Sequence, residues 1–586
     1  MTSRKKTTLV SVTLSLIILG VIGYFTVNAF LAVFADTEIK TNIGLNGESL
    51  SDKLLVASID GARFYYFKVD GKITISGYYG HKKQVKIPAS IDGAPVTVIA
   101  PGAFAISCPI FSPIIDDIEI GRFSTGAQSI ETLTIPKSVV SMSSSSFDES
   151  IPWYKNLKKQ SGSFLVVNGT LFEYNGSGGA VIIPKGVTRI GDGAFVDKVT
   201  VNSVVIPEGV TSIGDAAFSG CSLENITIPD SVTTIGTEAF ERCSNLTDVF
   251  LPKPGSSTLI DCFSFSETPW FEQLENTAAN GFVIANHILF EYNGPAKVVI
   301  PDGIMCIATN AFTYSGAIHG EKVQDITIPS SVITIGPHAF TETDSLETVT
   351  IVCDHTMIGN EAFRGCDQLS SVTISGNEVT IGAGAFKDCT MLETINFLSR
   401  ATSIGREALA GSALTSVAFP DGITSINQRM CAGCTNLHFV SIPKGVTKID
   451  NSAFMNCTDI AYITIPDGVT YIGTNAFYKC TLLPSDFTLP DSVNTIGEQA
   501  FRDSGLMAIK IPGSVTLIGR GAFRDCDSLE SATLSEGTTS IGADAFRDAR
   551  CWKQSKLLQV LLLLAQMPLK ARYGQRPQRI VSSCLG

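Results

Sequence analysis

The sequence predicts a β-rich solenoid, a curved right-handed coil of about 18 stacked repeats with short helical turns. A chain of 586 residues exceeds what one ordinary core can organise, so it forms several domains or one repetitive array. Hydrophobic residues reach 44%, charged residues stay at 17%, and glycines number 52. That composition suits many short buried strands separated by turns. A motif that returns at nearly constant spacing then favours the array.

The repeat is marked by the motif I-G-x-x-A-F. Consecutive copies mostly lie 22 to 24 residues apart, as Ile213 and Ile235 or Ile358 and Ile381 illustrate. A second pattern, L-x-x-V-x-I-P, lies upstream, for example at residues 437–443. Clear copies of the first motif begin at Ile190, Ile213, Ile235, Ile335, Ile358, Ile381, Ile472, Ile496, Ile518 and Ile541, and looser ones at Ile99, Ile307, Ile404 and Ile449.

Each part of this unit has a structural interpretation. In V-x-I the two apolar side chains point one way and the middle residue the other way, as in a strand. Proline, which lacks an N–H donor, ends that strand. V-x-x-I then forms a second short extended piece, and glycine permits the turn into A-F-x-x-C, which we interpret as a helical turn. One unit cannot bury its own apolar residues, so the units stack around a continuous core and isolated repeats should not fold.

The N-terminus has the pattern of an export signal. Three basic residues among the first six precede an apolar run over residues 9–34. Val33 and Ala35 provide the small residues that a signal peptidase accepts, and the long apolar run could equally span a bilayer. Residues 1–35 are therefore either a cleaved signal peptide or an uncleaved N-terminal membrane anchor. Residues 36–70 lead into the solenoid, and in both cases the protein is extracellular, at the cell surface or secreted.

The C-terminus departs from the repeat. The solenoid is expected over residues 71–550, and the remaining residues 551–586 contain six Lys or Arg and no Asp or Glu. Three interpretations remain open for this basic, leucine-rich tail. It is a frameshifted or truncated gene end, an amphipathic helix that caps the last coil, or a membrane-associating segment too short to span a bilayer.

The repeat unit resembles the BspA-type leucine-rich repeats of bacterial surface proteins and of some protist surface proteins. Residues 75–104 are similar to the opening module of that family, and two inserts near 148–180 and 266–298 follow its habit. The inserts share four aromatic or proline landmarks, which are Pro152, Trp153, Phe164 and Tyr174 in one and Pro269, Trp270, Phe282 and Tyr292 in the other. The resemblance implies a leucine-rich-repeat solenoid with a role in cell-surface adhesion or host interaction, without a named ligand.

Eight of the 15 cysteines share one phase of the repeat. They lie three residues after the phenylalanine position in most units, where Ser315, Ser412 and Ser504 stand in other units. Because serine replaces them, we interpret them as buried free thiols, with scattered disulfides, a metal site or a redox pair at Cys431 and Cys434 as alternatives. This structural cysteine ladder comprises Cys221, Cys243, Cys366, Cys389, Cys434, Cys457, Cys480 and Cys526.

The outward residue of V-x-I is the candidate ligand-facing position. Short hydroxyl side chains dominate it, and they could form a hydrogen-bonding platform for a protein or a glycan. The alternative is that threonine simply favours exposed strand positions, and the mixed neighbouring residues argue against ice binding. This candidate stripe comprises Thr134, Thr227, Thr327, Thr350, Thr373, Asn396, Ser441, Thr464, Thr488 and Thr533.

These observations favour recognition over catalysis. A net charge of −12 argues against nucleic acid as a partner, because such modules need clustered Lys and Arg. No H-E-x-x-H, G-x-S-x-G or glycine-rich phosphate loop is present, so we expect no catalytic, cofactor or metal site. The prediction is a non-enzymatic, adhesin-like protein that binds an extracellular or host macromolecule and meets the membrane only through an uncleaved N-terminus. A purely structural spacer protein and, less favoured, an undetected hydrolase are the alternatives.

Overall fold

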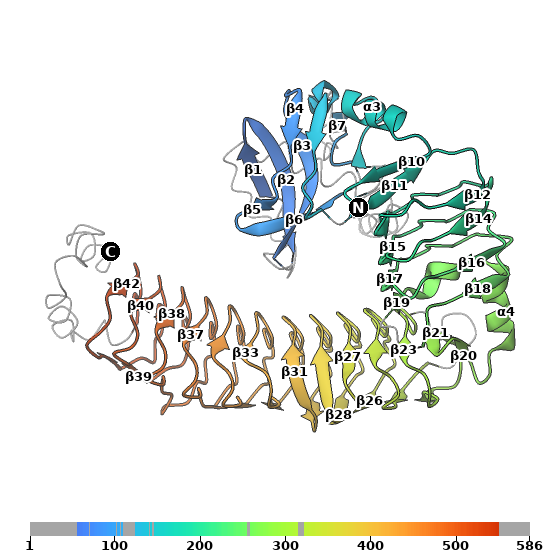
Figure 1. Ribbon diagram of the computed structural model, residues 1–586. Coiled ribbons are helices and arrows are strands. Elements are labelled where there is room, and N and C mark those ends of the chain that lie inside the picture. The colour runs from blue at the N-terminus through green and yellow to red at the C-terminus, as the bar shows by residue number, and fades with distance from the viewer. Residues whose placement is uncertain are drawn as a thin grey trace, which may run out of the picture. The chain divides into compact units, whose positions relative to one another are not determined.

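The computed structural model describes residues 55–549 except 70, 101, 106, 109–122, 140, 143–145, 255–257 and 314–321. The expected signal or anchor segment at 1–35, the start of the leader and the basic tail at 551–586 lie outside the described residues. Within them the chain is a β-solenoid of about 19 turns, close to the number expected from the repeats (Figure 1). The chain divides into unit 1 (Met1–Pro252 with Phe263–Glu272) and unit 2 (Lys253–Cys262 with Gln273–Gly586).

Unit 1 opens with an antiparallel meander. Its strands are β1 (Leu55–Ile59), β2 (Ala62–Val69) and β3 (Lys72–Tyr79), so the second half of the expected leader is folded. β3 then pairs in parallel with β6 (Ala94–Ile99), and β5 (Ser90–Ile91) pairs with β6 in antiparallel fashion. The first coil therefore presents a paired strand where a bare edge would invite association.

The V-x-I segments form the first of two strand ladders, called here the first ladder. In unit 1 it comprises β4 (Gln84–Lys86), β9 (Thr132–Thr134), β12 (Gly179–Ile182), β14 (Val201–Val205), β16 (Asn225–Thr227) and β18 (Asp248–Phe250). In unit 2 it comprises β22 (Lys297–Val299), β24 (Asp325–Ile328), β26 (Thr348–Cys353), β28 (Ser371–Gly376), β30 (Thr394–Phe397), β32 (Ser416–Ala418), β34 (Phe439–Ser441), β36 (Tyr462–Ile463), β39 (Ala508–Ile511) and β41 (Ser531–Leu534).

The residues that end on the motif isoleucine form the second ladder. In unit 1 it comprises β13 (Arg189–Ile190), β15 (Ser212–Ile213) and β17 (Thr234–Ile235). In unit 2 it comprises β23 (Cys306–Ile307), β25 (Thr334–Ile335), β27 (Thr356–Ile358), β29 (Glu378–Ile381), β31 (Arg400–Ile404), β33 (Ser425–Ile426), β35 (Lys448–Ile449), β37 (Tyr471–Ile472), β38 (Thr495–Ile496), β40 (Leu517–Ile518) and β42 (Ser540–Ile541). The remaining short elements are β7 (Ser107–Cys108), β8 (Phe123–Ser124), η2 (Ala127–Ser129), β19 (Leu259–Ile260) and η4 (Cys262–Phe265).

Both ladders are parallel and pair like residues with like. Thr350 pairs with Thr373 in the first ladder, and Ile335 pairs with Ile358 in the second. In unit 2 the two ladders run as separate rows, with β26 and β28 in one and β27, β31 and β33 in the other (Figure 1). The register that the repeat predicts is therefore the register that the structure has.

The A-F-x-x-C segment is a series of tight turns, where a helical turn was expected. Phe340 donates its N–H to the carbonyl of Ala362 in the next coil at 2.7 Å, so this segment pairs between coils. His338 and Glu342, two residues before and two after Phe340, have φ angles of 55° and 56°. Left-handed residues interrupt a right-handed helix, which explains why no helical turn forms.

The motif glycine allows a close approach of successive coils. A Cβ on Gly359 would lie 2.5 Å from the backbone nitrogen of Pro337 in the preceding coil. That separation is far below van der Waals contact, so a side chain on Gly359 would push these two coils apart. The requirement is local to such units, because Ala308, Asn427 and Asp450 occupy the corresponding position in others.

The core is a column of stacked rings. In unit 2 Phe340 lies 4.7 Å from Phe363, with ring planes 3° apart, and Phe363 lies 5.1 Å from Phe386. Leu409 and Cys431 take the same position in the following coils, and all five side chains are buried. Like residues therefore pack on like residues, as the stacked-repeat interpretation predicted.

Each insert is a helix followed by a β-hairpin. The first contains α3 (Pro152–Gln160), β10 (Phe164–Val167) and β11 (Thr170–Tyr174), and the second contains α4 (Pro269–Thr277), β20 (Phe282–Ala285) and β21 (Ile288–Tyr292). The hairpin registers correspond, since Phe164 pairs with Tyr174 and Phe282 with Tyr292. Each hairpin returns the chain to the second ladder, where β11 pairs with β13 and β21 with β23. No helix in the described part of the chain is both long and apolar enough to cross a membrane.

Candidate functional site

The outward positions of the first ladder form the candidate binding surface. All ten residues of the candidate stripe are exposed or half-exposed, and eight of them lie within first-ladder strands. Thr464 directly follows β36, and Thr488 lies in a coil without a first-ladder strand. In that coil Pro490 lies ten positions after Cys480, whereas in the preceding coil Pro466 lies nine positions after Cys457, and the longer segment also contains Pro484. Pro484 lies two residues before Asp486, the residue that corresponds to Tyr462 on β36.

The stripe side chains are not used by the fold. Threonines just before the second-ladder strands donate their hydroxyls to the preceding coil, as Thr211 does to the carbonyl of Thr188 at 3.0 Å and Thr470 does to that of Thr447 at 3.2 Å. None of the ten stripe side chains hydrogen-bonds to another residue that the structure describes. Their donors and acceptors therefore remain available to a ligand, and this separates the two sets of threonines.

The first ladder also displays apolar residues that the candidate stripe omitted. Ile182 and Val205, adjacent in register, occupy the middle position of V-x-I and are 71% and 54% exposed. Phe250, at 59%, and Val299, at 70%, occupy the same position further along. The signal was present in the sequence, because the middle position of V-x-I carries Ile, Val or Phe in these units. These apolar residues were missed because the candidate stripe included only hydroxyl and amide side chains at the middle position.

Two aromatic rings lie on the outward face of unit 2. Phe439 on β34 and Tyr462 on β36 are adjacent in register and are 48% and 60% exposed. The ring of His438 packs edge-on against Tyr462 at 5.2 Å, and its Nδ1 lies 3.6 Å from the Asp459 carboxylate. Exposed aromatic faces next to free hydroxyls can contact apolar and polar parts of one ligand at the same time.

The cysteine ladder links each coil to an earlier one. Its thiols are buried and free, and each donates to the backbone carbonyl of the residue at the phenylalanine position one coil earlier. Cys221 reaches Phe195 at 3.2 Å, Cys366 reaches Phe340 at 3.1 Å, and Cys457 reaches Cys431 at 2.9 Å. The same bond is formed by Cys243, Cys389, Cys434, Cys480 and Cys526. Sequence reasoning placed these thiols in the interior but missed their carbonyl partners.

Burial keeps two thiols of the ladder, Cys221 and Cys243, protonated at neutral pH. Burial raises the pKa of Cys221 and of Cys243 to about 12, so neither is a thiolate at neutral pH. Cys431 and Cys434 are both free and fully buried, and solvent does not reach the one close pair in the sequence. Among residues 55–549 that the structure describes, no three His, Cys, Asp or Glu side chains are grouped as a metal site requires.

The geometry defines a leucine-rich-repeat solenoid whose first ladder has an exposed outward face. A family model described as "BspA type Leucine rich repeat region (6 copies)" matches residues 166–288, 283–408, 313–438, 356–484 and 447–559. These ranges together cover more than half of the chain. The chain therefore belongs to the BspA-type leucine-rich-repeat family, as its motifs predicted.

The chain is also similar to solved structures at low sequence identity. A leucine-rich repeat protein from Bacteroides ovatus is 21% identical, covering 86% of this chain and 92% of that chain, with a TM-score of 0.34. A leucine rich cell surface protein from Faecalibacterium prausnitzii is 18% identical over 83% and 96%, with a TM-score of 0.19. The T. pallidum leucine rich repeat protein is 22% identical over 43% and 87%, with a TM-score of 0.24. No curated protein matches the chain.

Proposed function

We propose that this chain is a non-enzymatic binding protein that recognises an extracellular macromolecule, a protein or a glycan, across the outward face of its first ladder. Each coil contributes outward side chains at the strand spacing of about 4.8 Å. Repeats of this kind create extended surfaces that suit large ligands better than small substrates.

The observation that supports this proposal most is the contrast between the two sets of threonines. Hydroxyls on the second ladder are bonded to the preceding coil, while stripe residues such as Thr350 and Thr373 keep theirs unbonded within the described chain. Exposed Ile182, Phe439 and Tyr462 add apolar contacts to the same type of face.

The proposed location is outside the cytoplasm, at the cell surface or in the medium. The support is the sequence of residues 1–35, whose basic start and long apolar run suit export. Family membership is consistent with a surface role. The buried state of the thiols fits this location as well, because burial protects them from oxidation there.

The test is saturable binding by the full-length purified protein. Immobilised protein is exposed to matrix proteins, to glycans and to host cell surfaces, and bound ligand is measured as a function of concentration. The proposal expects saturation with at least one of these ligands. Complete absence of saturable binding would favour the second candidate, a spacer protein, which the regular spacing of the coils also suits.

A further inference from the structure

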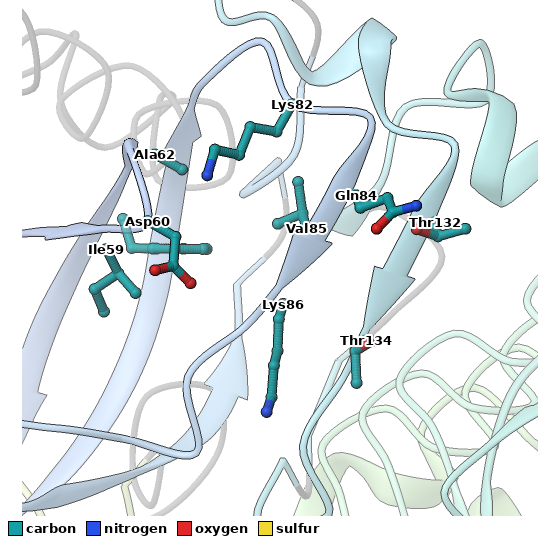
Figure 2. Close-up of a pocket in the computed structure, with 10 residues that line it drawn as sticks. Ile59, Asp60, Ala62, Lys82, Gln84, Val85, Lys86, Thr132 and Thr134 are labelled. Atoms are coloured by element: carbon teal, nitrogen blue, oxygen red, sulfur yellow. The ribbon is translucent and has the colours of Figure 1, made fainter.

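We propose that a cavity at the N-terminal end of the first ladder binds the acidic sugar residue of a glycan. This proposal rests on the proposed function and names a ligand class for one end of the outward face. The cavity lies wholly in unit 1 and has a volume of about 340 Å³. Small-molecule sites are commonly roughly 300–1,000 Å³, so one sugar residue is an occupant of suitable size. Figure 2 shows the side chains that line it.

One side of the cavity is the outward face of the first two coils. Gln84 pairs with Thr132, and Lys86 pairs with Thr134, on the parallel strands β4 and β9. All four side chains are exposed and line the cavity. Because Thr134 is the first residue of the candidate stripe, a ligand lying along the stripe would reach this cavity.

The other side is the turn that joins β1 to β2. Ile59 pairs with Ala62, and the two residues between them, Asp60 and Gly61, have φ angles of 50° and 74°. Two successive left-handed residues make a tight hairpin turn, for which Asp-Gly is a favoured pair. One side of the cavity is therefore a hairpin turn whose conformation the Asp60-Gly61 pair favours.

The aliphatic part of a lysine side chain lies against this turn. The Cε atom of Lys82 is 3.6 Å from the position that a Cβ on Gly61 would occupy, so glycine leaves room for that side chain. Ala62, Phe64 and Val85, all buried, form the apolar part of the lining.

The charges of the lining favour an anion. Neither Lys82 nor Lys86 forms an ion pair with any residue in the described part of the chain. Lys83, between them in sequence, does so with Glu131 at 2.8 Å and does not line the cavity. In a chain of net charge −12, two unpaired ammonium groups beside a concave surface attract anions locally.

The mixed lining favours an acidic sugar over an acidic peptide. Asp60, across from Lys86 in Figure 2, can only accept hydrogen bonds. A sugar acid offers hydroxyl donors to Asp60, Gln84 and Thr132 together with an anionic group for the lysines, whereas the side chains of an acidic peptide offer carboxylates without hydroxyl donors for Asp60. A lysine ammonium is a compact charge without planar preference, so the acidic group is either a carboxylate or a sulfate.

The experiment measures binding of defined oligosaccharides to the full-length protein by calorimetry or NMR. The probes are trigalacturonic acid, its methyl ester, a sulfated maltotriose and hexaglutamate, each at low and high NaCl. Lys82→Gln and Lys86→Gln remove one charge each, and Lys83→Gln is the matched control. Thermal unfolding establishes that each variant is folded.

We expect at least one acidic sugar to bind more tightly than the methyl ester and than hexaglutamate, and the trigalacturonic acid and sulfated arms to decide between carboxylate and sulfate. Lys82→Gln and Lys86→Gln each weaken that binding about tenfold, as loss of a charge-assisted hydrogen bond implies, and high salt weakens it further. Binding of neither acidic sugar, equal binding of ester or hexaglutamate, or an equal effect of Lys83→Gln would overturn the inference. The two proposals can fail separately. If a macromolecule binds the stripe saturably and Lys86→Gln does not affect that binding, the proposed function stands and this inference fails.

Discussion

The Sγ atom of Cys480 donates a hydrogen bond across 3.1 Å to the carbonyl oxygen of Phe454, one coil earlier. The same carbonyl also accepts the N–H of Cys457 at 3.1 Å. A buried backbone acceptor is thus bonded both within its coil and from the following coil. The phase of cysteine in the repeat therefore reflects a hydrogen bond between coils as well as packing.

Replacing Cys480 tests this bond. Cys480→Ala removes the donor and leaves a small void, so we expect a loss of about 1–2 kcal/mol in the free energy of unfolding. Cys480→Ser should cost less, because it keeps a donor that can still be bonded: at this phase Ser412 donates to the carbonyl of Leu409 in its own coil at 2.8 Å. Urea unfolding of both variants measures the difference. A serine variant less stable than the alanine variant would contradict the bond's role.

The raised thiol pKa values predict a loss of stability at alkaline pH. The folded pKa of Cys221 and Cys243 is about 12, above the ordinary value of 9.0. Because the folded state favours the protonated thiol, its contribution is complete below pH 9 and is lost progressively as pH rises toward 12. Urea midpoints measured from pH 7 to pH 11 should therefore fall above pH 9.

A double variant separates the contribution of these two thiols from that of other groups that titrate at alkaline pH. Cys221→Ser with Cys243→Ser removes two titrating groups, so the decline above pH 9 should be shallower than in the wild-type protein. Native thiols should also react with a maleimide far more slowly than thiols in urea. An unchanged decline in the double variant would show that other buried groups control the transition, such as Cys306 and Tyr66, whose pKa values burial also raises to about 12.

The ring column predicts an asymmetry between two substitutions of Phe363. Phe363→Ala leaves a cavity between Phe340 and Phe386 and should cost about 3–5 kcal/mol. Phe363→Leu should cost under about 1.5 kcal/mol, because Leu409 fills the same position in a later coil and is fully buried there. Chemical unfolding of the two variants provides the measurement. Equal costs would mean that ring stacking, rather than volume, determines stability at this position.

Two glycines that do not have positive φ angles allow two effects of a Gly→Ala substitution to be distinguished. One effect is a clash with the neighbouring coil, and the other is the lower flexibility of the unfolded chain. Gly359→Ala places a Cβ 2.5 Å from the Pro337 nitrogen and should destabilise by about 1–3 kcal/mol. Gly445→Ala meets only the Ile423 carbonyl oxygen at 3.4 Å, and it should be neutral or stabilising by up to about 1 kcal/mol. Thermal unfolding distinguishes them, and a similar effect of both would contradict the close stacking of coils.

The sequence predicted those parts of the fold that repeat. Ile335, Phe340 and their equivalents are buried, and Thr350 faces outward, because a fixed period determines which side each residue takes. The turns around Phe340 were missed, because His338 and Glu342 in that unit give a weak signal for positive φ. The equivalent positions of other units give a stronger one, since Gly365, Asp388 and Asn456 are left-handed and belong to the residue types that favour this conformation.

The parts of the site that depend on distant segments also escaped prediction. Residues 55–69, expected as a leader, form β1 and β2, and the cavity exists because their turn faces β4 and β9. No local pattern specifies that approach. Ile182 and Val299 were overlooked for a different reason, since apolar residues were assumed to point inward although the alternation placed them outside.

The central claim is that the outward face of the first ladder is the binding surface. Its most direct test is saturable binding of matrix proteins and glycans to full-length Thr373→Arg, compared with Ser403→Arg, which alters an exposed strand residue on the second ladder. We expect at least tenfold weaker binding for Thr373→Arg and about the wild-type affinity for Ser403→Arg. Undiminished binding by Thr373→Arg, or loss only in Ser403→Arg, would contradict it.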